Sequence, residues 1–373
     1  MLPYGRQSVS EQDIEAVTAI LRGDWLTTGP TVAAFEQALS DLVGGHRAVS
    51  CTSGTAALHI AYAAAGVGAG DEVVTTPMTF VATASGASLL GAKVVFADVE
   101  EDTALLDPAA VDALVTDRTK VIAAVDYAGH PADYAALQSI ADRVGALTLG
   151  DAAHSIGGFS GGRPVGDLAD LTTLSFFPTK NLTTAEGGAV VAKDAAIAQR
   201  AHEFHFVGLM RDADRFRIKD EGPWHQEVHE FGLNYRLTDL QCAFGLSQLA
   251  RLAGFKQRRA EITARYNAAL ADVDGLRLPV QREGVDPAWH LYPVRILDDR
   301  RREVFEKMRA AGIGVQVNYI PVYWHPVYAD LGYQRGMCPN AEAFYAEELS
   351  LPLYPDLTDD QVDQVVETLI GTL

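Results

Sequence analysis

Short apolar runs alternate with amphipathic helical patterns through much of this chain of 373 residues. Between about residues 45 and 205 the pattern predicts strands at 72–75, 93–99, 120–125 and 145–150, and helices at 81–90, 108–115 and 134–144. A regular strand–helix–strand order is typical of α/β proteins. We therefore expect a mainly parallel mixed sheet with helices on both faces.

The ends of the chain follow other patterns. Near the N-terminus, Ser10 precedes a helical repeat at 11–21, so Ser10 is expected to cap that helix. After about residue 239 a long helical pattern reaches residue 271. The segments that follow predict a strand at 291–296, a helix at 302–311, a strand at 315–319 and two closing helices. We expect a large domain at 1–250, including the N-terminal segment, and a smaller α+β domain at 251–373.

Composition and charge narrow the function classes. The net charge of −19 argues against nucleic-acid partners, because phosphate contacts dominate nucleic-acid affinity. The three cysteines, Cys51, Cys242 and Cys338, are far apart and odd in number, and no paired Cys or His spacing suggests a metal site. No secretory leader or run of membrane-spanning length is visible. We expect a cytoplasmic protein without disulfides, metal or membrane partners.

A single lysine occupies an unusual context. Lys180 follows the run 171–177, whose residues are apolar or carry hydroxyl groups, and precedes the Gly187–Gly188 pair. Burial disfavours the charged form of an amine and lowers its pKa. Such an amine can form a Schiff base with an aldehyde. Lys180 is therefore the candidate attachment point for pyridoxal phosphate (PLP).

PLP also needs a carboxylate facing its ring nitrogen. Asp151 follows the apolar run 145–150, which places it at the carboxyl end of a strand, where open α/β sheets bind ligands. By itself Asp151 could equally be a turn or cap residue. Its combination with Lys180, 29 residues later, favours the functional interpretation.

The phosphate and the ring of PLP need further groups. Ser53, Gly54 and Thr55 begin a predicted helix, where free backbone N–H groups can bind an anion. An ordinary helix cap would look the same. Ser175 could add a hydroxyl group to the phosphate, and Phe80 could stack on the ring, although a Phe at such a turn is more often part of a core.

An ordered set of segments resembles the DegT/DnrJ/EryC1/StrS family of PLP-dependent sugar aminotransferases. The matching segments are Tyr4–Gln7, Trp25–Pro30, Ser53–Thr55, Pro77–Phe80, Asp151–His154, Ser175–Lys180, Glu186–Gly188 and Gly232–Arg236. The resemblance covers nearly the whole chain and implies a fold-type I PLP transferase architecture. It also implies that the enzyme is a transaminase with L-glutamate as amino donor.

Within this family, the segments at 3–7 and 25–30 are similar to the pseudaminic-acid branch. That branch aminates UDP-4-keto-6-deoxy-N-acetyl-β-L-altrosamine, a nucleotide-linked keto sugar, at its keto group. Asp126, the Phe176–Phe177 pair and the segment 204–211 depart from common family patterns, which leaves the sugar open. The alternatives are dTDP- or GDP-linked keto sugars and keto-cyclitols of antibiotic pathways.

The resemblance implies further roles. Asn234 would reach the PLP phosphate of a neighbouring subunit, which makes a homodimer with a composite site. His154 would lie near the ring. The residues expected to bind substrate are Tyr4, Arg6, Thr28, Glu186, Arg236 and Tyr319. Tyr319 belongs to an aromatic cluster that could instead be core.

Three rival classes are less consistent with the sequence. PLP-dependent sugar dehydratases of this family replace the Schiff-base lysine with histidine, whereas this chain has Lys180. A cysteine desulfurase would need a reactive thiol, for which Cys338 is the candidate. A PLP-binding regulator would carry a DNA-binding domain and a basic surface, and neither is visible.

Overall fold

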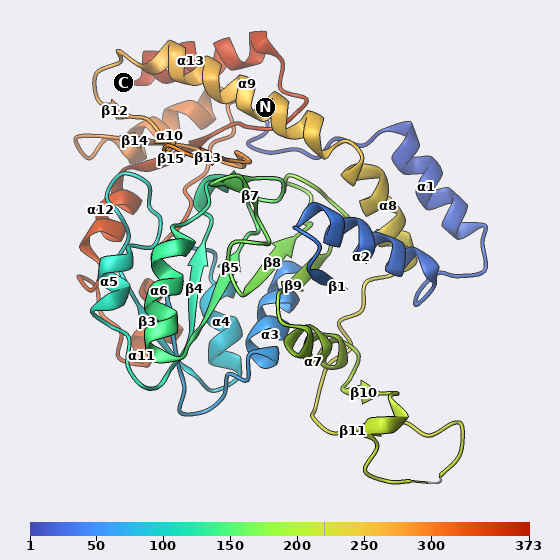
Figure 1. The fold of residues 1–373 in the computed structure, drawn as a ribbon. Coiled ribbons are helices and arrows are strands. Elements are labelled where there is room, and N and C mark those ends of the chain that lie inside the picture. Colours follow the sequence, from blue (N-terminus) through green and yellow to red (C-terminus); the bar gives the residue numbers. More distant parts are fainter. Residues whose placement is uncertain (220) are drawn as a thin grey trace.

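A seven-stranded sheet forms the centre of the molecule. The computed structural model describes residues 1–219 and 221–373. The strands are β1 (Arg47–Cys51), β2 (Glu72–Thr75), β3 (Lys93–Phe96), β4 (Thr119–Val125), β5 (Leu147–Asp151), β8 (Leu171–Ser175) and β9 (Gly188–Ala192). Their order is β1-β9-β8-β5-β4-β2-β3, and β9 runs antiparallel to both of its neighbours while the other pairs are parallel. The predicted α/β class and the mainly parallel mixed sheet are confirmed (Figure 1).

Helices cover both faces of this sheet. The core beside one face includes side chains of α3 (Gly54–Ala64), α4 (Ala82–Leu89) and α7 (Ala195–His205). The core beside the other includes side chains of α2 (Pro30–Leu42), α5 (Pro108–Asp112), α6 (Tyr134–Val144) and α8 (Asp239–Leu249). Successive residues of a strand alternate between these cores: Val73 enters the first and Val74 the second. This alternation explains why the strands read as continuous apolar runs.

The N-terminal helix α1 (Glu11–Leu21) has the predicted bounds and the predicted cap. Ser10 and Asp13 satisfy each other's backbone N–H groups in a capping box. The helix packs against α8. Gln248 of α8 and Arg251, which follows that helix, donate to the buried Asp13 carboxylate. The predicted single helix at 239–271 is wrong, because α8 ends at Leu249 and α9 (Leu252–Leu270) starts anew. Arg251 stands at this break, held by Asp13 and by the Ser8 carbonyl.

A second sheet lies in the C-terminal part. It joins β12 (Leu276–Arg277), β14 (Tyr292–Ile296) and β15 (Glu348–Leu351) in antiparallel register. The helices α9, α10 (Arg301–Ala310) and α13 (Asp359–Thr372) lie over it at the top of Figure 1. The closing part contains α11 (Pro326–Asp330), α12 (Pro339–Glu347) and α13, with β15 between the last two, rather than the two helices expected.

The predicted strand at 315–319 is wrong. The segment is extended, but only Gln316 forms a bridge to the sheet, with Ser350. At Asn318 the backbone N–H donates to the Glu348 carboxyl group, and the carbonyl accepts from the Tyr127 hydroxyl. These side-chain partners replace the ladder of a strand.

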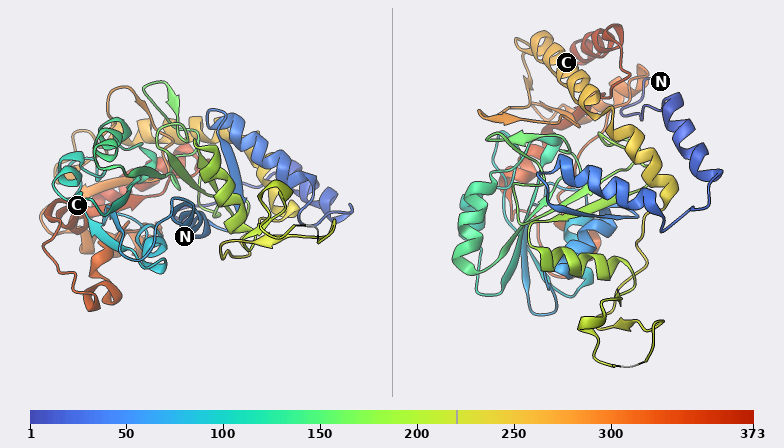
Figure 2. Two further views of the ribbon diagram at one scale, coloured as in Figure 1. Left: turned by 60° about the horizontal axis from the view of Figure 1, so that its bottom comes forward. Right: turned by 45° about the vertical axis from the view of Figure 1, so that its right-hand side comes forward.

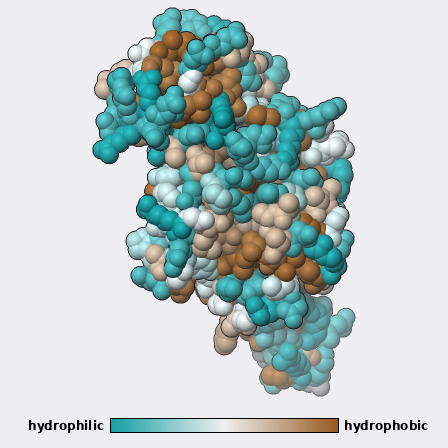
Figure 3. Space-filling model, turned by 90° about the vertical axis from the view of Figure 1, so that its left-hand side faces the viewer, coloured by the Kyte–Doolittle hydropathy of each residue, from teal (hydrophilic) through white to brown (hydrophobic). Residues whose placement is uncertain are grey.

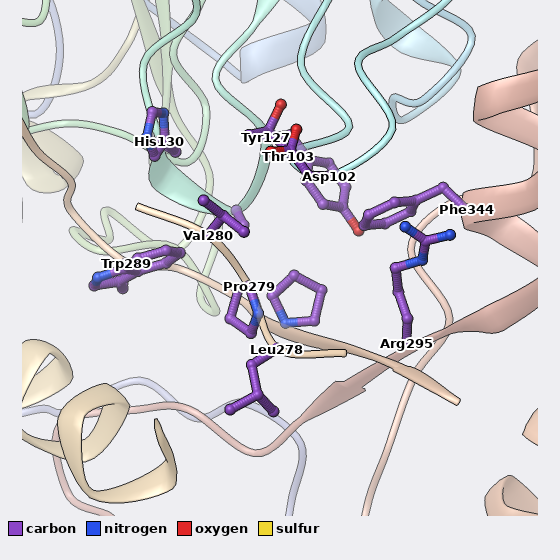
Figure 4. Close-up of a pocket in the computed structure, with 12 residues that line it drawn as sticks. Asp102, Thr103, Tyr127, His130, Leu278, Pro279, Val280, Trp289, Arg295 and Phe344 are labelled. Atoms are coloured by element: carbon purple, nitrogen blue, oxygen red, sulfur yellow. The ribbon is translucent and has the colours of Figure 1, made fainter. Parts of the chain in front are cut away.

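The two parts of the chain meet along a closely packed seam. Side chains of Val73 in the large sheet and Val294 in the second sheet belong to one continuous core. A cavity of about 20 Å³ lies in this seam. Tyr127 and His130 line it on one side, and Trp289 and Arg295 line it on the other (Figure 4). Such a volume has room for about one water molecule. A small sheet of β6 (Phe159–Ser160), β7 (Arg163–Pro164) and β13 (Val285–Asp286) also crosses from one part to the other. The domain boundary near residue 250 stays a prediction.

The chain between α7 and α8 leaves the body of the molecule. This arm contains β10 (Leu209–Met210), the 3-10 turn η2 (Ala213–Arg215) and β11 (Glu227–Val228), and it projects downward in Figure 1 and in the right-hand view of Figure 2. Trp224 is 77% exposed on it and Phe231 is 96% exposed. Such exposure of large apolar side chains is typical of surfaces that contact another protein.

Elsewhere the surface is mostly polar. The face in Figure 3 is hydrophilic over most of its area, with apolar residues gathered in a patch on each part of the molecule. Within the ranges that the structure describes, no helix is both long and apolar enough to span a membrane.

Candidate active site

A cavity of about 760 Å³ opens at the carboxyl ends of β5 and β8. Its wall brings together eleven of the predicted site residues: Tyr4, Ser53, Gly54, Thr55, Phe80, Asp151, His154, Ser175, Lys180, Glu186 and Tyr319. These positions are far apart in the chain. They meet because parallel strands end at the same edge of a sheet.

Lys180 lies in the turn after β8. Its backbone N–H donates to the Phe177 carbonyl at 2.9 Å, which fixes the turn. Burial lowers the pKa of the Lys180 amine to about 8, and the nearby Asp151 carboxylate opposes this shift. The amine is thus partly uncharged near neutral pH, which is the state that attacks an aldehyde.

Asp151 ends β5 and is 5% exposed. Its Oδ2 accepts from the Thr83 hydroxyl at 2.7 Å, and its Oδ1 accepts from the Ala153 N–H at 3.2 Å. Burial raises the pKa of Asp151, while these two donors and Lys180 oppose the rise. A cationic ring nitrogen close to Asp151 would favour its charged form. The sequence analysis missed Thr83, whose role depends on the contact between α4 and β5.

Two histidines stand side by side in the wall. The ring centroids of His154 and His290 are 4.4 Å apart, and His154 Nε2 lies 3.2 Å from the Tyr319 hydroxyl. Burial lowers the pKa of both imidazoles well below the usual value, so both are neutral at pH 7. The Asn181 amide donates to the carbonyls of His154 and of Ala288, which lies two residues before His290 in the chain. His290 was not among the predicted site residues.

The start of α3 forms a cradle at one end of the cavity. Ser53 caps the helix by accepting from the Ala56 N–H at 3.1 Å. Among the described residues, no acceptor meets the N–H groups of Gly54 and Thr55. A Cβ at Gly54 would lie 2.8 Å from Cβ of Ser175, and one at Gly188 would lie 2.5 Å from the Ser53 carbonyl oxygen. The backbone here is free of side chains and presents donors, so it fits a phosphate group.

Phe80 lies at the lip of the cavity, between β2 and α4. Its side chain is 60% exposed, and its ring centroid is 6.3 Å from that of Tyr319. The alternative that Phe80 is a core residue is therefore wrong. An exposed aromatic face at this position can pack against a flat ligand ring.

Four predicted site residues do not line this cavity. Arg6 and Thr28 are exposed. Asn234 pairs with Phe206 in an isolated bridge, and the Arg236 guanidinium lies 4.5 Å from the centroid of the Phe206 ring. Asn234 and Arg236 thus stand at the base of the arm and do not line the cavity that contains Lys180 of the same chain.

The cysteines are free thiols buried in the structure. Burial raises the pKa of Cys338 to about 12, so its thiol is protonated at neutral pH. This argues against the cysteine desulfurase alternative.

The profile of the DegT/DnrJ/EryC1/StrS aminotransferase family matches residues 7–370. The chain belongs to this family. It is 38% identical over 374 residues to the spore coat polysaccharide biosynthesis protein SpsC of Bacillus subtilis, covering 99% of this chain and 96% of the relative. The cofactor of the family is PLP, and this sugar aminotransferase has the cavity, lysine and phosphate cradle that PLP requires.

Solved structures agree with this assignment. A sugar aminotransferase of Streptococcus pneumoniae, Spr1654, has a TM-score of 0.93 at 30% identity in its pyridoxamine phosphate form, covering 100% of this chain and 99% of its own. The same protein was also solved in its PLP form. PseC of Helicobacter pylori, an aminotransferase of pseudaminic acid biosynthesis, has a TM-score of 0.92 at 30% identity, covering 100% of this chain and 98% of its own.

Proposed function

We propose that this aminotransferase moves an amino group from L-glutamate to the keto group of UDP-4-keto-6-deoxy-N-acetyl-β-L-altrosamine. The observation that carries the transamination is the cavity that unites Lys180 and Asp151 beside a phosphate cradle. The choice of sugar is supported by the N-terminal segments and by the likeness to PseC of Helicobacter pylori.

The residues of the cavity have different roles in the proposed transamination. Bound PLP supplies an electron sink for the negative charge that develops at the α-carbon of the amino donor. Lys180, with its lowered pKa, would accept the proton from that α-carbon and pass it to the carbon of the cofactor that carried the aldehyde group. Asp151, oriented by Thr83, holds the proton on the ring nitrogen. Phe80 and His154, which line the cavity, would hold the ring of the cofactor.

The phosphate of the cofactor would be held at the start of α3. Backbone N–H groups of Gly54 and Thr55 and the hydroxyl groups of Ser53 and Ser175 surround the cradle. Tyr4, Glu186 and Tyr319 line the remaining wall, where the sugar would lie. Arg6 and Thr28, which stand outside it, would act at its rim.

The charges of the cavity favour a composite site in a homodimer. Among the described residues that line it, Lys180 is the one lysine or arginine, and Asp151 and Glu186 are acidic. A nucleotide-linked sugar is anionic and needs positive partners. Arg236 and Asn234 lie near the exposed arm, from which a second subunit could bring them to the cavity of the first.

A complementation experiment tests the composite site. Lys180→Ala and Asn234→Ala are each expected to be nearly inactive. Random hybrids of the two are expected to regain about a quarter of the wild-type activity, because half of the dimers are hybrids and each hybrid has one intact site. The measurement is turnover after coexpression of the two variants.

The matched control is a chain with both substitutions, coexpressed with the wild type. Its hybrids contain no intact site if the site is composite. No regain in the first mixture, with both single variants folded, would contradict the shared site. Full activity of Asn234→Ala would remove Asn234 from it.

Absorbance spectra test the substrates. We expect the purified protein to show the band of lysine-bound PLP, to lose it on addition of L-glutamate, and to regain it with the UDP-linked keto sugar. If a dTDP- or GDP-linked keto sugar restored the band instead, the proposed substrate would be wrong, but the proposed transamination would stand. Recovery with a keto-cyclitol alone would exclude a nucleotide sugar.

A further inference from the structure

One buried carboxyl group next to the cavity has no role in the proposed chemistry. Glu348 begins β15 and is 0% exposed. Among the described residues, no lysine or arginine lies within ion-pair distance of its carboxyl group. Burying such a group is costly unless its hydrogen bonds are made.

The hydrogen bonds of Glu348 all serve one segment of the cavity wall. Its Oε2 accepts from the Asn318 backbone N–H at 2.6 Å, and its Oε1 accepts from the Ser350 hydroxyl at 2.5 Å. Ser350 in turn accepts from the Asn318 side-chain amide at 3.1 Å. Asn318 therefore has both its backbone and its side chain tied to the same face of β15.

The strand explains this arrangement. Glu348 and Ser350 are two residues apart and point to the same side of β15, whereas Leu349 and Leu351 point into the hydrophobic core and are 0% exposed. Backbone bonds between Gln316 and Ser350, at 2.8 and 3.2 Å, align the wall segment with the strand.

Two tyrosines of the cavity depend on this segment. The Asn318 amide donates to the Tyr4 hydroxyl at 2.8 Å. Tyr319 follows Asn318 directly, and its hydroxyl lies 3.2 Å from His154 Nε2. On the other side, the hydroxyl of Tyr127, labelled in Figure 4, donates to the Asn318 carbonyl at 2.5 Å. The backbone N–H, the backbone carbonyl and the side-chain NH₂ group of Asn318 are therefore all hydrogen-bonded.

We propose that Glu348 is a positioning residue that fixes the wall at 316–319 and thereby places the Tyr4 and Tyr319 hydroxyls against the keto sugar. The inference rests on the proposed function for its substrate, but the wall itself is a property of the protein alone. Glu348 does not line the cavity and acts through Asn318.

The state of the carboxyl group guides the choice of variants. Burial raises the pKa of Glu348 to about 8, although Ser350, the Asn318 N–H and Arg301 oppose the shift. The group is therefore mostly neutral at pH 7, and glutamine is its matched replacement. Glu348→Gln keeps an oxygen for the Asn318 N–H, whereas Glu348→Ala removes it.

Steady-state kinetics at pH 7 form the first test. Glu348→Ala is expected to raise KM for the keto sugar by about ten-fold or more, because small displacements of positioning groups weaken substrate alignment. The absorbance of bound PLP should not change. Glu348→Gln is expected to restore KM to within about two-fold of the wild type, since the hydrogen bond to the wall is kept. A wild-type KM for Glu348→Ala, or equal damage in both variants, would overturn the proposal.

Amide hydrogen exchange, measured without substrate, separates this proposal from the proposed function. In Glu348→Ala, exchange should become faster in a peptide that spans 316–319 and stay unchanged in one that spans 54–64. If exchange became faster but no keto sugar proved to be a substrate, Glu348 would still anchor the wall, and the proposed function would be rejected. Unchanged exchange would reject the anchor even if the sugar reacts.

Two further variants serve as a control and as a substitute for Glu348→Ala. Glu72→Gln removes another buried carboxylate, which pairs with Arg118 and Lys93 away from the cavity, and should leave KM unchanged. If Glu348→Ala does not fold, Ser350→Ala takes its place, because it removes one partner of both Glu348 and Asn318. A wild-type KM and exchange rate in folded Ser350→Ala would then contradict the proposal.

Discussion

Lys180→Ala is expected to lower turnover by about a thousand-fold or more, since the variant loses both the attachment point and the proton-transfer group. The same variant should lose the absorbance band of lysine-bound PLP while keeping its fold. The structural basis is the position of the Lys180 amine in the cavity and its pKa of about 8. Turnover and absorbance of the purified variant are the measurements.

Lys193 offers a matched control. Burial also lowers its pKa, but it lies outside the cavity that contains Lys180. Lys193→Ala should keep both the absorbance band and the turnover. Transamination by Lys180→Ala at the wild-type rate would contradict the central assignment.

Asp151→Asn is expected to bind PLP but to transaminate roughly a hundred- to a thousand-fold more slowly, because an amide cannot hold a proton on the ring nitrogen by charge. The side chain would still accept from Thr83, so the wall should keep its shape. The rate of the half-reaction with L-glutamate is the direct measurement. A wild-type rate would remove Asp151 from its role.

Asp126 provides the comparison for this variant. It is 0% exposed and accepts from Tyr134, Ser155 and the Ala132 N–H, so it supports the structure at the end of β4. Asp126→Asn should lower the unfolding temperature while leaving the half-reaction rate near the wild-type value. The substitution at Asp151 would then lower the half-reaction rate, whereas the substitution at Asp126 would lower the unfolding temperature.

Much of the fold could be predicted because local sequence patterns determine where its helices and strands begin and end. The bounds of α1 and α6 match the prediction at both ends. The apolar run before Asp151 predicted a strand, and the structure places this residue at the end of β5. These features depend on caps, turns and periodic burial, which neighbouring residues determine.

Other features could not be read from the sequence because distant groups decide them. The segment at 315–319 looks like a strand, but Glu348 and Tyr127 bind the backbone of Asn318 in place of a neighbouring strand. β15 escaped prediction because it is short and adjoins a helix. Thr83 gave no signal, since its importance comes from a single contact with Asp151.

The sequence by itself determined the α/β class, the strand ends that carry Lys180 and Asp151, and the family resemblance. Only the tertiary structure decided that Phe80 is exposed at the lip of a cavity, that His290 stands beside His154, and that Asn234 and Arg236 lie elsewhere. Local periodicity specifies which face of an element is buried. The packing of elements far apart in the chain specifies which side chains meet there.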